Sequence, residues 1–109
     1  MRNQMLKLAE LNDTLRSTFV GGVVLLSDGV AALDCDSKRR LLATVRTFDD
    51  FSQDNDPYDE HDFGCVELDE ERFFFKIDYY DRSMTAHSLD KADPKVTTRV
   101  LTIMRADEY

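Results

Sequence analysis

Two apolar runs separated by a pair of acidic residues limit most strongly how this chain can fold. The runs are "HDFGCVEL" (residues 61–68) and "ERFFFKIDYY" (residues 71–80). Each mixes apolar and polar side chains in the manner of a strand with one buried face, and a two-residue connection is typical of a β-hairpin. The sequence therefore predicts an antiparallel hairpin with Asp69 and Glu70 at its tip.

The two-residue turn also predicts the register of the hairpin. Val66 then lies opposite Phe73 and Gly64 opposite Phe75, while a slip of one residue would mix the two faces. In this register the core side is formed by Val66, Leu68, Phe73, Phe75 and Ile77. The other face places His61 opposite Asp78, close enough to interact, with Lys76 and Tyr80 beside them.

The N-terminal half predicts two helices and a strand. Leucines and a phenylalanine at spacings of three and four predict an amphipathic helix over residues 3–18, which Gly21 and Gly22 end. The apolar run at residues 23–26 predicts a short buried strand, followed by a turn in which Gly29 takes a positive φ. A second helix is expected over residues 38–51, with Ser37 as its N-cap.

The C-terminal segment has the start signal of a third helix. Asp93 suits the N-cap and Pro94 the first helical position. The apolar residues that follow repeat at helical spacing, at Val96, Val100, Ile103 and Met104. The segment is also rich in β-branched residues, which favour a strand. The expected class is α+β in the order α-β-α-β-β-α, with a small antiparallel sheet of about three strands and helices packed on one face. We expect a single domain over residues 1–109.

The charge of the chain is concentrated in one segment. Residues 49–71 contain eleven of the 22 acidic residues and no lysine or arginine, whereas the whole chain has a net charge of −8. Such a segment repels nucleic acid and attracts basic partners or cations, so direct DNA or RNA binding is not expected. The sequence contains no signal peptide and no apolar run that could span a bilayer, which predicts a cytoplasmic protein without membrane contact.

Several motifs together resemble a known family. They include "FVGG" (residues 19–22), "DNDPYDEHDFG" (residues 54–64) and "KIDYYD" (residues 76–81). The chain is similar, from about residue 11 to its end, to small proteins that carry a domain of unknown function in alphaproteobacteria and on their plasmids and integrative elements. The genes of these similar proteins often have antirestriction-type genes as neighbours, and this resemblance implies a role in mobile-element biology such as counter-defence. Similar sequences often have Asp-Gly at the hairpin tip, where this chain has Asp69-Glu70.

The acidic stretch does not match the known calcium-binding loop. An EF-hand loop starting at Asp54 would need glycine at the sixth position and glutamate at the twelfth, but the chain has Asp59 and Cys65 there. We therefore predict no metal and no cofactor. An alternative hypothesis is a small enzyme or metal-dependent hydrolase, centred on His61 and Asp78 with Lys76 as a further donor. No nucleophile in a known catalytic motif accompanies these residues.

The leading hypothesis is a non-enzymatic interaction protein. Its acidic loop would imitate a phosphate backbone and bind a basic protein surface, such as that of a nucleic-acid-binding defence complex. The residues expected to supply the charge are Asp54, Asp56, Asp59, Glu60 and Asp62, and those expected to set the geometry are His61, Lys76, Asp78 and Tyr80. A third hypothesis makes the loop purely structural, tied to the domain by side chain to backbone hydrogen bonds. The oligomeric state and the partner are not specified by the sequence.

Overall fold

The computed structural model describes residues 2–109, with side chains described from Lys7 onward. Its helices and strands, in chain order, are α1 (Arg2–Thr18), β1 (Val23–Leu26), α2 (Asp28–Ala31), α3 (Cys35–Arg46), β2 (Phe63–Leu68), β3 (Glu71–Tyr80), β4 (Thr98–Arg105) and the short 3₁₀ helix η1 (Ala106–Glu108). The strands form one mixed sheet in the order β1-β4-β3-β2, parallel only between β1 and β4.

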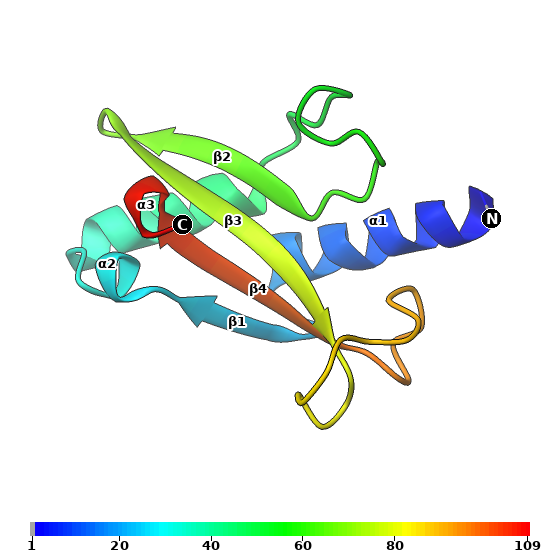
Figure 1. Ribbon diagram of the computed structural model, residues 1–109. Coiled ribbons are helices and arrows are strands. Elements are labelled where there is room, and N and C mark those ends of the chain that lie inside the picture. The colour runs from blue at the N-terminus through cyan, green and yellow to red at the C-terminus, as the bar shows by residue number, and fades with distance from the viewer. Residues whose placement is uncertain (1) are drawn as a thin grey trace.

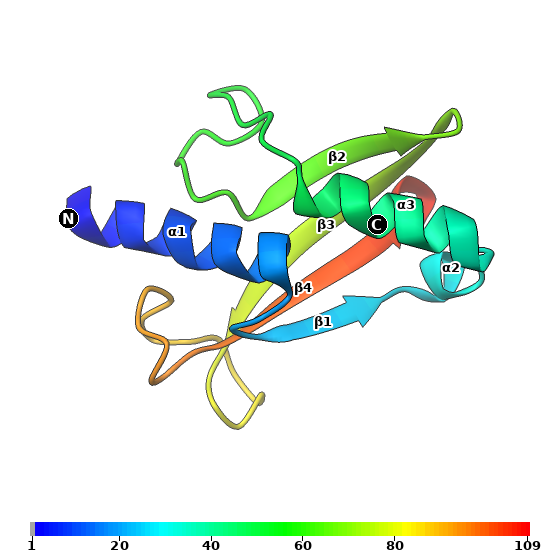
Figure 2. The same ribbon diagram turned by 180° about the vertical axis from the view of Figure 1, so that it is seen from behind.

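The helices α1 and α3 cover one face of this sheet, as Figure 2 shows, and the opposite face is turned toward the viewer in Figure 1. The predicted α+β class with helices on one face is therefore confirmed. In the part of the chain that the structure describes, no helix is long and apolar enough to cross a membrane.

The hairpin has the predicted register. Val66 pairs with Phe73 and Gly64 with Phe75. Asp69 and Glu70 form the tip with φ angles of 53° and 68°, which is the left-handed backbone that a tight two-residue turn requires. The prediction of the hairpin and its tip is confirmed, and Glu70 occupies a position that glycine would adopt without strain.

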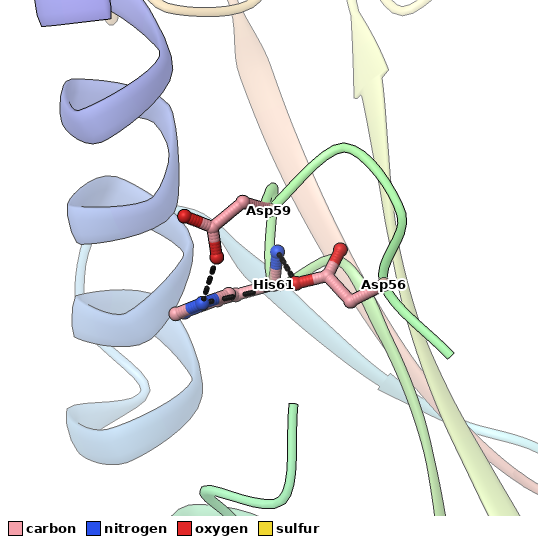
Figure 3. A group of neighbouring side chains, drawn as sticks. All are labelled: Asp56, Asp59 and His61. Atoms are coloured by element: carbon pink, nitrogen blue, oxygen red, sulfur yellow. Dashed lines mark hydrogen bonds and ion pairs between the residues drawn. The ribbon is translucent and has the colours of Figure 1, made fainter. Parts of the chain in front are cut away.

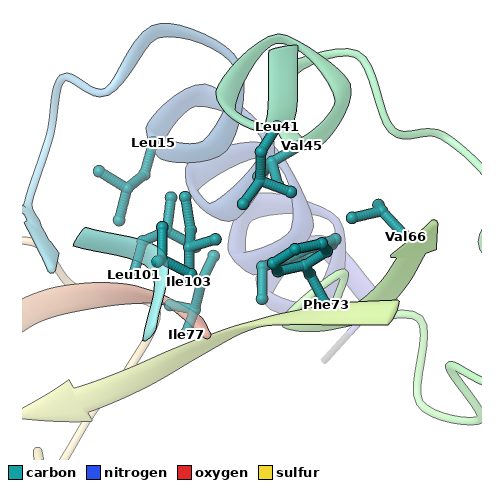
Figure 4. Close-up of a cluster of buried hydrophobic side chains, with 10 residues drawn as sticks. Leu15, Leu41, Val45, Val66, Phe73, Ile77, Leu101 and Ile103 are labelled. Carbon is teal, nitrogen blue, oxygen red and sulfur yellow. The ribbon is translucent and has the colours of Figure 1, made fainter. Parts of the chain in front are cut away.

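The core lies between the hairpin and the two long helices. Phe73 and Phe75 of β3 are fully buried against Leu15 of α1 and against Leu41 and Val45 of α3. Figure 4 shows Phe73 of the sheet converging with Leu15, Leu41 and Val45 of the two helices. Gly64 is required here, because a Cβ at this position would lie 2.3 Å from the ring of Phe75.

The predicted C-terminal helix is wrong. Residues 98–105 form the strand β4, which lies between β1 and β3 and is apolar on both faces, with Val100 and Met104 buried on one and Leu101 and Ile103 on the other. A strand buried on both faces lacks the alternation that would distinguish it from a helix, so β-branched content was the better guide. Asp93 caps a single turn by accepting a hydrogen bond from the Lys95 N–H instead of starting a helix.

Other local predictions are also corrected. β1 is an edge strand with exposed side chains and is not buried. Gly29 does not adopt a positive φ, because Ser27 caps the short helix α2 there. The helix α3 begins at Cys35 with Asp34 as its N-cap and ends at Arg46, so Ser37 lies inside the helix and donates its N–H to Asp34.

Candidate functional site

The acidic loop, residues 47–62, connects α3 to β2 and projects beside α1 (Figures 1 and 2). Its first half is held by its own hydrogen bonds. Asn55 accepts from the Ser52 N–H and donates to the Asp50 carbonyl, at 2.8 Å in each case. The ring of Phe51 packs edge-on against Phe48, which anchors this part of the loop to the core.

Asp56 organises the second half of the acidic loop from a buried position. Its carboxylate accepts the backbone N–H groups of Glu60 and His61, at 3.0 and 3.1 Å. Asp59 and His61 both have positive φ angles, of 54° and 59°. A buried carboxylate that collects backbone donors is a local cap, and it compensates part of the cost of this bent backbone. Asp56 is therefore a structural group and offers little charge to a partner.

His61 turns its side chain toward α1. The imidazole stacks on Phe51, with ring centroids 4.1 Å apart, and its Nδ1 lies 2.9 Å from a carboxylate oxygen of Asp13. Its Nε2 lies 3.0 Å from Asp59. Burial by itself lowers the pKa of His61, but the hydrogen bonds and charges of Asp13, Asp59 and Asp56 outweigh it, so the pKa is raised.

The predicted His61–Asp78 pair is wrong. The ladder between β2 and β3 begins at Phe63, and the positive φ of His61 turns the chain away from the strand direction before that point. Asp78 instead lies beside Lys76, with 3.0 Å between the Lys76 Nζ and its carboxylate. Both belong to the alternate set of β3 side chains that faces away from the helices, as does Tyr80, which stacks on His87. The structure does not bring these three residues together with His61.

Glu60 and Asp62 form a second group under the loop. Glu60 pairs with Lys91, whose Nζ lies 3.1 Å from both carboxylate oxygens, and Asp62 accepts a hydrogen bond from the Tyr79 hydroxyl at 3.2 Å. Burial, followed by the neighbouring Glu60 carboxylate, raises the pKa of Asp62 to about 6. Burial and the charge of Asp62 also raise the pKa of Tyr79. These carboxylates are engaged inside the protein and are poor candidates for a charged binding surface.

A buried asparagine links this group to the rest of the domain. Asn12 of α1 is fully buried and donates to the Glu60 carbonyl and to the Tyr79 hydroxyl, at 2.9 and 2.8 Å. It accepts from the Arg99 guanidinium at 2.9 Å. Sequence reasoning missed both Asn12 and Asp13, although Asn12 lies four residues after Leu8 and three before Leu15, on the apolar face of α1. A polar residue on such a face is the signal that would have identified it.

Three side chains of the acidic loop could contribute to a cation site. Asp56, Asp59 and His61 place one ligand atom each within 4.8 Å of one another (Figure 3). All three already have protein partners, since Asp56 caps the loop and His61 bonds to Asp59. A cation would have to replace the His61–Asp59 contact, and a closed four-ligand site would need a further donor.

The carboxylates exposed on the acidic loop agree only in part with the predicted set. Asp49, Asp50 and Asp54 are exposed and make no ion pair with any other described residue. Asp59 is also exposed, with 70% of its side chain accessible, and Tyr58 beside it is 71% exposed. The sequence located this patch, but of the five predicted charge carriers only Asp54 and Asp59 lie on the surface.

The chain matches one protein family over residues 26–108, described as "Protein of unknown function (DUF3768)". The chain belongs to this family. The match covers most of the sequence, including the acidic loop and the strands β2, β3 and β4. The predicted resemblance to a family of unknown function is therefore confirmed. No match was found among curated proteins or among solved structures. DUF3768 membership therefore identifies relatives without assigning a chemistry to the loop.

Proposed function

We propose that this protein is a non-enzymatic interaction protein whose acidic loop binds a basic protein surface. The observation that carries the proposal is the set of exposed carboxylates of Asp49, Asp50 and Asp54, which no basic side chain of the described chain neutralises. Unpaired charges of one sign on a compact surface create a field that attracts a partner of opposite sign and accelerates its association.

The loop is also suited to binding because its backbone is already held in place. Asp56 and Asn55 tie the backbone together, and His61 fastens it to α1 through Asp13. An ordered loop loses less conformational entropy on association than a flexible one, so more of the electrostatic attraction appears as affinity. The structural hypothesis and the binding hypothesis thus apply to different residues of the same loop.

The partner that the proposal favours is a protein with a groove for nucleic acid. A row of carboxylates can occupy such a groove in place of phosphates, and the implied association of similar sequences with mobile elements makes a defence nuclease or its complex an example of this class. DNA or RNA should then compete with the protein for the same partner.

Affinity capture from a lysate of the native host tests the proposal. The baits are the wild type, the triple variant Asp49→Asn/Asp50→Asn/Asp54→Asn, and a control with the same change in charge, Glu10→Gln/Asp90→Asn/Asp93→Asn. We expect a partner to be retained by the wild type and the control, to be lost by the triple variant, and to dissociate when the salt is raised from about 0.05 M to about 0.5 M. Capture that is equal for all three baits, salt-independent, or absent with the wild type would contradict the proposal.

A further inference from the structure

β1 leaves one edge of the sheet open. It pairs with β4 on one side only, and in the part of the chain that the structure describes no strand pairs with its other side. Figure 1 shows β1 as the outermost strand, with no other element beyond it. Unpaired backbone groups at such an edge are a template for another strand, and proteins usually block them with charged residues, proline or a bulge.

β1 carries neither a charged residue nor a proline. Residues 17–27 are the longest stretch of the chain without aspartate, glutamate, lysine or arginine, and they contain no proline. The side chains of Val23, Leu25 and Leu26 are 38%, 48% and 36% exposed, and Val20 before them is 69% exposed. The strand at the opposite edge, β2, carries the exposed Glu67. The difference identifies β1 as the edge available for pairing.

The directions of the backbone groups determine which registers are possible. The Ser27 N–H donates to the Ile103 carbonyl of β4 at 3.0 Å. Because N–H and C=O groups alternate sides along a strand, the groups of Leu25 and Val23 also face β4, and those of Gly22, Val24 and Leu26 face the open edge. An antiparallel partner strand must place these outward-facing residues opposite outward-facing residues of its own.

We propose that a second copy of this chain pairs with this edge, antiparallel and about a two-fold axis at Val24. Val24 of one copy then pairs with Val24 of the other, and Gly22 of each copy pairs with Leu26 of the other. All paired residues lie within residues 22–26, and the two sheets become continuous. On the face away from the helices, Val23 of each copy lies opposite Leu25 of the other, which gives two apolar cross-strand pairs.

The shape and the charge of the edge fit a second copy. On the helix side, the Leu26 side chain of one copy lies over Gly22 of the other, where the lack of a side chain leaves room for it. Gly22 is also required within its own chain, because a Cβ on it would lie 2.3 Å from the Arg99 carbonyl. In one copy the paired segment is followed by Asp28, the first residue of α2, and in the other it starts beside the hollow that Arg82 lines together with Gly21 and Gly22. Neither Asp28 nor Arg82 forms an ion pair within the described chain. A chain with a net charge of −8 repels its own copies, so a charge-free edge flanked by complementary charges is the surface on which two copies can meet.

This dimer would leave the acidic loops free. The loop leads into β2, at the opposite edge of the sheet from β1 (Figure 1). The dimer would therefore present two acidic loops at its two ends. Its formation does not depend on the proposed partner, and the proposed partner binding does not depend on the dimer.

Sedimentation velocity over a range of concentrations, up to roughly 1 mM, tests the proposal. The wild type, a chain of 12.6 kDa, should show a reversible monomer–dimer equilibrium. Two variants place like charges opposite each other across the axis: Val23→Glu/Leu25→Glu and Val23→Lys/Leu25→Lys. Each alone should dimerise at least about tenfold more weakly, because like charges directly opposite destabilise a strand pair. The lysine variant is the matched control for net charge, since it reduces the overall negative charge and should still lose the dimer.

Mixing the two variants provides the decisive measurement. In the mixed dimer every glutamate lies opposite a lysine, so the heterodimer should be restored, and circular dichroism should show that each variant is folded. A wild type that remains monomeric throughout, a lysine variant that dimerises like the wild type, or a mixture that stays monomeric would overturn the proposal.

Discussion

The half-buried carboxyl of Asp62 should make the domain less stable as the pH rises. Its pKa in the folded protein is about 6, raised from an ordinary value of 3.8 by burial and by the neighbouring Glu60. The folded state therefore binds this proton more tightly than the unfolded state does. The stability penalty is small at pH 4, develops between pH 4 and pH 6, and is fully present above pH 6.

The magnitude follows from the size of the pKa rise. An increase from 3.8 to about 6 corresponds to about 3 kcal/mol, and solvent screening of a half-buried carboxyl reduces this to about 1–2 kcal/mol. The substitution Asp62→Asn imitates the protonated acid. Its carbonyl can accept the Tyr79 hydroxyl hydrogen bond, and its amide can donate toward Glu60. We therefore expect Asp62→Asn to stabilise the domain by about 1–2 kcal/mol at pH 8 and to have little effect at pH 4.

The assay is urea denaturation followed by circular dichroism, from pH 4 to pH 8, for the wild type and the variant. The other acidic groups titrate in both proteins, so their contributions cancel in the difference between the two free energies of unfolding. Asp54→Asn is the control, because Asp54 lies in the same loop, is exposed and forms no ion pair with the described residues, and it should show no pH-dependent difference. A difference that is constant with pH, or a variant that is less stable than the wild type at pH 8, would refute the reasoning.

Three further substitutions test other parts of the structure. His61→Ala should lower the free energy of unfolding by about 1–2 kcal/mol, because it removes the stacking on Phe51 and the contact with Asp13. The raised pKa of His61 means that this loss is largest below pH 6 and smaller at pH 9, which thermal unfolding at the two pH values can measure. Gly64→Ala should lower the free energy of unfolding by at least about 2 kcal/mol, because the added Cβ would overlap the Phe75 ring. Cys65→Ala, on the exposed side of β2, is the control in the same urea denaturation assay. Glu70→Gly should stabilise by about 0.5–1 kcal/mol by relieving the positive φ, and an unchanged denaturation midpoint would contradict the strained turn.

The parts of the fold that were predictable from the sequence are those set by short-range patterns. The β2–β3 hairpin, its register and its two-residue tip follow from alternation and turn length, and α1 follows from the spacing of Leu8, Leu11 and Leu15. The strand β4 was mistaken for a helix because both of its faces are apolar, and neither period dominates in such a strand. The β-branched residues favoured a strand, and the pairing of β4 between β1 and β3 in the tertiary structure decided it.

The acidic loop divides in the same way. The sequence alone determined where the negative charge is concentrated, because charge density is a local property of residues 49–71. Only the tertiary structure decided which carboxylates face solvent. Asp56 is buried by the turn that it caps, Glu60 and Asp62 are engaged by Lys91 and Tyr79, and His61 is drawn to Asp13 instead of Asp78. The partners in these last three contacts lie between 17 and 48 residues away along the chain, so the contacts depend on how the helix and the sheet pack and have no signature in the local sequence.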